Sequence, residues 1–166
     1  MATAERRVAR ELQECMSSPP VGMMITLPSE TDLYHWSVTL AGPPASVYSG
    51  GTFTLSVNLP PDYPFKAPQV TFVTRIYHPN VTNDSVGSIC LSILKPENWK
   101  PASRVRAVLD SIRQLLIEPN PDDPLEPRIA EEFKNNPREF EKNARAYVAR
   151  YAQPQSQQSQ QQPTKK

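Results

Sequence analysis

Cysteine, histidine and glycine are scarce in this chain of 166 residues, which contains two, two and five of them. Two isolated cysteines and two histidines lack the ligand spacing of a zinc centre, so no metal site is predicted. Long apolar runs are also missing, because no stretch approaches the ~20 apolar residues that a membrane span requires. Residues Met1–Arg10 are charged where a signal peptide needs an apolar run. With Cys15 and Cys90 in different predicted elements, these absences favour a reduced, intracellular protein.

A strong excess of charge is absent as well. The net charge of +1 gives no field that would favour nucleic acid or a membrane surface as a partner. The length suits one domain, and a hydrophobic fraction of 38% is compatible with a real core. Nineteen prolines are many for a helical bundle and indicate long ordered connections instead.

The first predicted element is an amphipathic helix over Ala4–Met16, with Val8, Leu12 and Cys15 or Met16 at helical spacing. Charged residues fill the other face, and i,i+4 pairs are expected for Arg7 with Glu11 and Arg10 with Glu14. The charged positions are Glu5, Arg6, Arg7, Arg10, Glu11 and Glu14. They form either a solvated helix face or a docking surface. Cys15 is interpreted as a small core residue.

The hydrophobic period changes to two between Met23 and Thr74, which predicts strands with one buried face. Proline and glycine turns separate the strands at short intervals, which suits an antiparallel meander that begins with Met23–Leu27. The inward positions are Trp36, Val38, Leu40, Phe53, Leu55, Val57, Leu59, Val70 and Phe72. His35 falls on the polar side and is interpreted as a surface histidine.

A proline-rich segment follows at Tyr63–Pro68, where three prolines force a rigid extended loop. Phe65 then has no regular element to pack into. It is either an exposed anchor for a partner protein or an aromatic ring tucked under the sheet.

The C-terminal half predicts three helices. The first covers Arg104–Ile117 with Ser103 as its N-cap, the second covers Arg128–Asn135, and the third begins after Asn136 with a capping-box pattern. Beyond Ala152 the chain contains no apolar residue and is expected to be disordered. The predicted fold class is α+β: an N-terminal helix, a four-stranded antiparallel meander, an irregular active-site segment and three further helices. The predicted domain boundaries are 1–152 for this core and 153–166 for the tail.

The irregular stretch Arg75–Ala102 contains the one candidate nucleophile outside a predicted helix, Cys90. Its apolar neighbours and the preceding Gly87 suit a half-exposed thiol that a large acyl partner can approach. A cysteine thiolate can attack a thioester, hold the acyl group and lose it to an amine. Asn80 either donates to the developing oxyanion, a contact worth ~3 kcal/mol of barrier, or caps its own loop.

A cysteine hydrolase is another interpretation of this site, and it would need His78 or His35 as its base. Pro79 suggests a rigid turn at His78, so we interpret His78 as a structural residue of the active-site loop. Such a hydrolase would turn over thioesters without any amine acceptor.

Three regions, in this order along the chain, carry a resemblance to a known family. They are the proline loop Tyr63–Pro68, the active-site stretch, and Pro119–Leu125. The active-site stretch contributes His78-Pro79-Asn80, Cys90-Leu91 and Trp99-Lys100-Pro101-Ala102. The chain resembles the ubiquitin-conjugating enzymes over roughly Glu5–Tyr151. The resemblance implies a thioester of ubiquitin on Cys90 and transfer to a substrate lysine or a ligase cysteine. It implies ubiquitin, the ubiquitin-activating enzyme, RING or HECT ligases and protein substrates as partners. It also implies a monomer in cytoplasm and nucleus, without a cofactor because the activating enzyme consumes the ATP.

The resemblance extends to individual positions. Asp123 is expected to orient the incoming lysine or accept its proton, and Ser92 stands where many family members have aspartate. The expected ligase-binding residues are Arg6, Arg7, Arg10, Pro64, Phe65, Lys100, Pro101 and Ala102. The interval from Asn80 to Cys90 is two residues longer than usual, so the loop between them must bulge.

Two alternatives remain within the resemblance. One is conjugation of another ubiquitin-like modifier, because the SUMO branch also reads Cys-Leu-Ser at the site, although that branch lacks the Tyr-Pro-Phe loop. The other is a noncatalytic ubiquitin-binding module, against which the presence of Cys90 argues.

Overall fold

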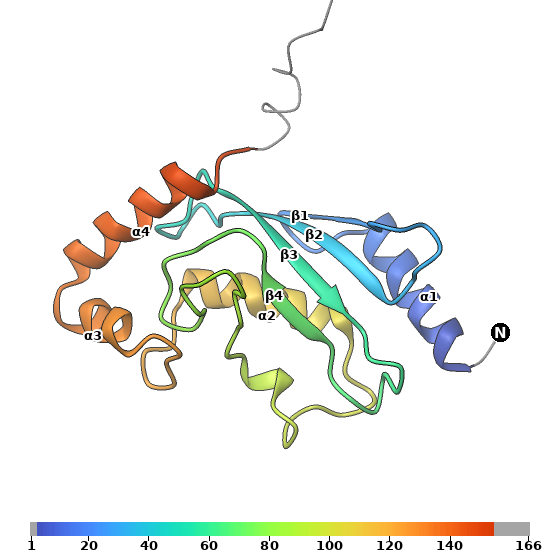
Figure 1. Cartoon of the computed structure of the whole chain (residues 1–166). Coiled ribbons are helices and arrows are strands. Elements are labelled where there is room, and N and C mark those ends of the chain that lie inside the picture. The colour runs from blue at the N-terminus through green and yellow to red at the C-terminus, as the bar shows by residue number, and fades with distance from the viewer. Residues whose placement is uncertain (1–2, 155–166) are drawn as a thin grey trace, which may run out of the picture.

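The computed structural model describes residues 3–154. Its order is α1 (Thr3–Ser17), β1 (Met23–Thr26), β2 (His35–Ala41), β3 (Thr52–Asn58), β4 (Gln69–Phe72), the 3-10 turn η1 (Ser92–Leu94), α2 (Val105–Ile117), α3 (Pro127–Asn135) and α4 (Pro137–Tyr151). The predicted α+β class and its sequence of elements are confirmed. Figure 1 shows α1 at one end of the molecule and α3 with α4 at the other.

The sheet is an antiparallel meander of order β1-β2-β3-β4. The strand register pairs the residues that the sequence predicts to face inward. Val38 pairs with Ile25 and Leu55, and Leu55 pairs with Phe72. These side chains share the buried face of the sheet, as the period of two requires.

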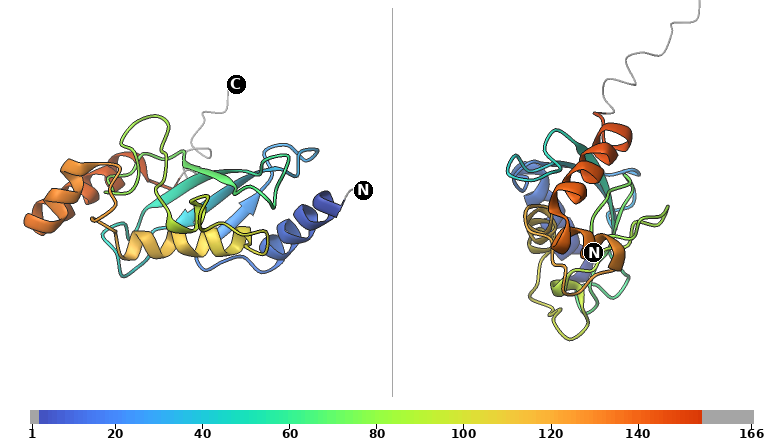
Figure 2. Two further views of the ribbon diagram at one scale, coloured as in Figure 1. Left: turned by 90° about the horizontal axis from the view of Figure 1, so that it is seen from below. Right: turned by 90° about the vertical axis from the view of Figure 1, so that its left-hand side faces the viewer.

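Helix α2 covers that buried face (Figure 2). One apolar stripe of α2 packs into the core. The stripe consists of Val105, Val108, Leu109, Ile112, Leu115 and Leu116.

One buried carboxylate joins α1, α2 and the Tyr63 loop, and it corrects two predictions. Glu11, expected on the solvated face, is buried and accepts hydrogen bonds from the Tyr63 hydroxyl (2.6 Å), the Val105 backbone N–H (2.9 Å) and Arg7 Nε (3.1 Å). Ser103 is not the N-cap of α2, because its hydroxyl accepts from the Lys100 backbone N–H instead. A carboxylate is favourable at a helix N-terminus, so Glu11 takes over the cap from a distant part of the chain.

The charged pairs of α1 follow from this arrangement. Arg7 pairs with Glu11 as predicted, and its Nη2 also donates to the carbonyl of Ser103 at 2.6 Å. Glu14 pairs with Arg104 at 3.4 Å, and within the described residues no Arg10–Glu14 pair forms.

Helix α4 begins with Pro137 at its first position, as predicted, whereas α3 begins at Pro127, one residue before the predicted start at Arg128. The Asn136 side chain caps α4 by accepting from the Glu139 N–H. Ala152 is fully buried and its carbonyl accepts from the Thr52 N–H, which ties the end of α4 to β3. The tail predicted to be disordered falls mostly at residues 155–166, outside the described residues. Among residues 3–154, no helix is long and apolar enough to cross a membrane.

Candidate active site

Cys90 lies on a short hairpin that sets it directly opposite Asn80. The Cys90 backbone N–H donates to the Asn80 carbonyl at 2.9 Å, and Thr82 N–H donates to the Ser88 carbonyl at the same distance. Val81 and Ile89 form an isolated antiparallel bridge between them. The longer interval expected from the resemblance is thus accommodated beyond the Thr82–Ser88 hydrogen bond, at the tip of this hairpin.

The hairpin tip is held by the Asp84 carboxylate, whose Oδ1 accepts from Thr82, Val86 and Gly87. These hydrogen bonds, with that from Gly87 first, lower the pKa of Asp84. Gly87 has φ of +66°, and a Cβ there would overlap the carbonyl of Phe72, so this position requires glycine.

Asn83 anchors the same tip to the C-terminal helices. Its backbone N–H donates to Glu126 Oε2 at 3.0 Å, and its side-chain amide donates to the Tyr147 hydroxyl at 3.0 Å. Arg75 donates to the Asn83 side-chain oxygen. Hydrogen bonds of Asn83 thus tie the hairpin tip to α4 and to Glu126, the residue before α3.

The Cys90 thiol shares one carboxylate oxygen with a lysine. Asp123 Oδ2 accepts from Cys90 Sγ at 3.3 Å and from Lys95 Nζ at 2.7 Å. Burial and then the Asp123 carboxylate raise the pKa of Cys90, while the Lys95 ammonium acts in the opposite direction. Lys95 in turn lowers the pKa of Asp123. The site is a thiol, a carboxylate and an ammonium in contact at the surface.

Sequence reasoning missed Lys95. Its charge was the one available sequence signal, because Lys95 is the only lysine or arginine between Arg75 and Lys100. What brings it back to Cys90 is the 3-10 turn η1, where the Lys95 N–H donates to the Ser92 carbonyl at 3.1 Å. A turn of three residues carries no periodic pattern that would have revealed this.

Asn80 is 1% exposed and joins the Cys90 hairpin to the Asp123 loop. Its side-chain amide donates to the carbonyls of Asn120 (2.7 Å) and Asp123 (3.0 Å), and its side-chain oxygen accepts from the Asn120 N–H (2.9 Å). Both amide hydrogens are therefore already donated to loop carbonyls. In this geometry Asn80 positions Asp123, and an oxyanion contact requires one of those hydrogen bonds to exchange.

His78 lies in the core behind the site with both ring nitrogens engaged. Nδ1 accepts from the Asn80 N–H and Nε2 donates to the Leu115 carbonyl, both at 2.9 Å, and the ring stacks on Tyr48. Burial lowers the pKa of His78 to about 4, which keeps the ring neutral. A ring held in this way cannot serve Cys90 as a base, and Pro79 continues the structural loop by accepting at its carbonyl from Leu125 and Glu126.

Ser92 stands at the start of η1, on the exposed rim of the site. Its hydroxyl and its carbonyl both accept from the Asn98 side-chain amide, at 3.2 and 2.9 Å. The structure thus uses Ser92 to fix the turn that carries Lys95.

The other cysteine has a different environment. Cys15 is 1% exposed on the apolar stripe of α1, and burial raises the pKa of its thiol. It belongs to the core cluster, whereas Cys90 is half-exposed.

The residues expected to bind a ligase form a surface from α1 to the two loops. Phe65 is 75% exposed, and it borders a hollow of about 300 Å³ together with Leu94 and Trp99. The Trp99 indole donates to the Pro64 carbonyl at 2.8 Å, so the two loops are held together. Pro101 follows Trp99 by two residues and is exposed.

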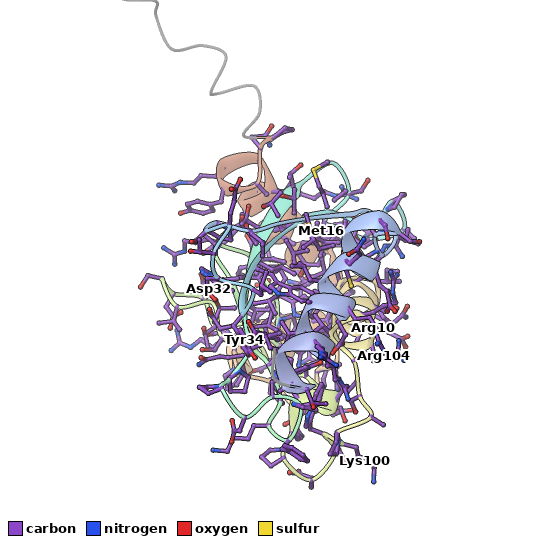
Figure 3. The ribbon with its side chains drawn as sticks, turned by 90° about the vertical axis from the view of Figure 1, so that its right-hand side faces the viewer. Arg10, Met16, Asp32, Tyr34, Lys100 and Arg104 are labelled. Carbon is purple, nitrogen blue, oxygen red and sulfur yellow. The ribbon has the colours of Figure 1, made fainter. Side chains whose placement is uncertain are left out.

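The basic face of α1 adjoins the second loop. A hollow of about 470 Å³ is lined by Arg6, Arg7, Arg10, Ala102 and Arg104, with Thr3, Glu11 and Glu14. Figure 3 shows Arg10 beside Arg104, with Lys100 further along the same side of the molecule. The expected ligase-binding residues thus border two hollows, one cationic beside α1 and one apolar beside Phe65.

Across residues 3–154, no group of three or more histidine, cysteine, aspartate or glutamate side chains is placed to hold a metal ion. A family model described as ubiquitin-conjugating enzyme matches residues 7–148. The match includes the Phe65 loop, the Cys90 hairpin and the Asp123 loop.

Proposed function

Because the chain belongs to the ubiquitin-conjugating enzyme family, we propose that it accepts ubiquitin as a thioester on Cys90 and passes it to a lysine amine or a ligase cysteine. The observation that carries this proposal is the half-exposed Cys90 thiol in contact with Asp123, beside Lys95. No cofactor on this chain is needed, because ATP is consumed by the activating enzyme. We expect the protein in cytoplasm and nucleus.

Charging exchanges one thioester for another. The Cys90 thiol loses its proton, and the thiolate attacks the carbonyl carbon of ubiquitin held on the activating enzyme. A new C–S bond forms, the old C–S bond breaks, and the activating enzyme's cysteine leaves as a thiolate. The Cys90 proton leaves to solvent, so charging needs no proton acceptor on this chain.

Discharge to an amine uses the same carboxylate differently. A lysine amine has an unperturbed pKa of ~10.4, so it arrives as an ammonium that must lose a proton. Asp123 orients that ammonium and accepts the proton as desolvation disfavours the charged form. The neutral amine then attacks the ubiquitin carbonyl carbon and forms a C–N bond. The C–S bond to Cys90 breaks, and the nitrogen gives its second proton to the departing Cys90 thiolate.

The decisive experiment incubates the protein with the activating enzyme, ATP and ubiquitin. We expect an adduct that reductant cleaves in the wild type and in Cys15→Ser, and a reductant-resistant ester in Cys90→Ser. A Cys90→Ala protein that still forms the labile adduct would disprove the assignment.

The choice of ubiquitin over another modifier is supported by the exposed Phe65 in the Tyr63–Pro68 loop. Presenting ubiquitin and SUMO, each with its own activating enzyme, tests this choice. We expect a thioester with ubiquitin, and preferential loading with SUMO would favour the alternative.

The proposed role of Asn80 is tested by separating charging from discharge. We expect Asn80→Ala to charge normally and to discharge slowly to free lysine, because it loosens Asp123 and removes the amide that reaches the oxyanion once one of its loop hydrogen bonds exchanges. A thermal melt of the same variant reports on the loop. Equal losses in charging and discharge would indicate a collapsed loop instead.

A further inference from the structure

One oxygen of Asp123 serves two groups, and only one of them is the nucleophile. Lys95 Nζ lies 2.7 Å from Oδ2, the same atom that accepts the Cys90 thiol at 3.3 Å. An acceptor lysine oriented by Asp123 needs this atom too. The chain therefore already places an ammonium of its own where the proposed substrate amine must bind.

Lys95 is held there by its backbone. Its N–H donates to the Ser92 carbonyl, and its carbonyl accepts from the N–H groups of Asn98 and Trp99, each at 2.9 Å. Asp123 is held from the other side, because its carbonyl accepts from the buried Asn80 amide. The Lys95–Asp123 pair thus spans two fixed backbones, while both side chains remain exposed enough to separate.

The ammonium of Lys95 is a poor nucleophile in this pair. The hydrogen bond to Asp123 raises the pKa of Lys95, which keeps the amine protonated. Lys95 therefore occupies the carboxylate without attacking the thioester beside it.

We propose that Lys95 determines acceptor specificity by competing with the incoming lysine for Asp123. The inference rests on the proposed function and concerns its second step. A lysine acceptor must displace Lys95 before Asp123 can orient it. A thiol acceptor has an unperturbed pKa of ~8.5 and needs no such help to ionise, so the competition leaves it unaffected. The pair thereby biases the charged enzyme towards thiol acceptors such as a ligase cysteine.

The test measures single-turnover discharge of the purified Cys90 thioester to free L-lysine and, separately, to mercaptoethanesulfonate as a thiol. We expect Lys95→Met to discharge to lysine about threefold faster, mainly through a lower apparent KM for lysine, a gain that matches the modest strength of an exposed ion pair. Discharge to the thiol should change by less than about twofold. Lys95→Arg keeps the charge and should discharge to lysine more slowly than Lys95→Met.

Two controls make the result specific. Lys142→Met removes one positive charge from α4, remote from the site in sequence, and should show no gain with lysine. In the Asp123→Asn background, Lys95→Met should also give no gain, because the contested carboxylate is gone.

Several outcomes would overturn the inference. They are an unchanged or slower lysine reaction in Lys95→Met, equal acceleration towards both acceptors, or a wild-type thioester that decays without acceptor and leaves ubiquitin attached to Lys95. The last outcome would make Lys95 an acceptor itself. Failure of the wild type to form any ubiquitin thioester would instead overturn the proposed function, and this inference with it.

Discussion

Two carboxylates organise opposite regions of this molecule, and they do so in opposite ways. Glu11 is buried between α1, α2 and the Tyr63 loop, with one donor from each of these segments. Asp123 lies at the surface, and its Oδ2 is shared by Cys90 and Lys95. One carboxylate has fixed partners and the other has exchangeable ones.

The two carboxylates differ in this way because Glu11 is shielded from water and Asp123 is exposed to it. A buried carboxylate that loses a partner leaves polar groups unsatisfied, so its hydrogen bonds hold the structure in one arrangement. An exposed carboxylate can replace a lost partner with water at little cost. Exchange of partners suits the group transfer proposed at Cys90, whereas the rigid Glu11 contacts support the loop that carries Phe65.

Removal of Glu11 should have the largest effect on stability. Glu11→Ala leaves Tyr63, Val105 and Arg7 without their acceptor, and we expect the free energy of unfolding to fall by about 4 kcal/mol. Urea denaturation measures the change. Glu14→Ala is the matched control, with the same residue type on the exposed side of α1 and an expected change within about 0.5 kcal/mol. Similar losses in both variants would contradict the comparison.

The next largest expected effect is a loss of stability at acid pH, caused by the buried His78. His78 is neutral in the fold with its pKa lowered to about 4, whereas an unfolded histidine titrates near 6.5. The unfolded state therefore binds more protons in this window, and stability should fall as pH drops from about 6.5 to 4, by roughly 3 kcal/mol. Nuclear magnetic resonance of the His78 ring checks the cause, since a ring titrating near 6.5 would show that it reaches solvent.

At the exposed carboxylate we expect a change in reactivity in place of stability. Asp123 contributes to the raised pKa of Cys90, so Asp123→Asn should lower that pKa and increase the thiolate fraction at neutral pH. Alkylation of the uncharged enzyme by iodoacetamide should be faster, with its pH profile shifted to lower pH. Asp122→Asn changes the neighbouring exposed carboxylate and should leave the profile unchanged. Slower alkylation of Asp123→Asn would contradict this account.

The discharge reaction tests the same carboxylate with substrate. We expect Asp123→Asn to slow transfer from Cys90 to lysine near neutral pH, with the defect shrinking at high pH where the amine is already neutral. Ser92→Asp, which adds a second carboxylate to the rim, should accelerate transfer. Identical pH profiles for wild type and both variants would remove Asp123 from the mechanism.

The smallest effect on stability belongs to Phe65. Since its ring is 75% exposed, Phe65→Ala should change the free energy of unfolding by less than about 0.5 kcal/mol. We expect the same variant to charge normally and to lose stimulation by a cognate RING or HECT ligase. Val73→Ala, which shortens another exposed apolar side chain, should keep that stimulation. A large drop in melting temperature for Phe65→Ala would show that the ring supports the core.

The sequence by itself determined the elements and their order, because hydrophobic period, proline and capping residues act over a few positions. The four strands, the stripe of α2 and the Asn136 cap were readable in this way. The three prolines predicted that Phe65 lies outside regular structure, and the structure decided between an exposed and a tucked ring by leaving it 75% exposed.

Only the tertiary structure decided which polar groups meet. Glu11 looked like one more charge on a solvated helix face, and Ser103 looked like the cap of α2, until α1 packed against the start of α2 and brought the stronger acceptor to Val105. Lys95 carried no signal beyond its charge, because its contact with Asp123 depends on a three-residue turn and on a loop 28 residues away. Hydrogen bonds and ion pairs between distant segments have no sequence period, so their partners are set by how the segments pack.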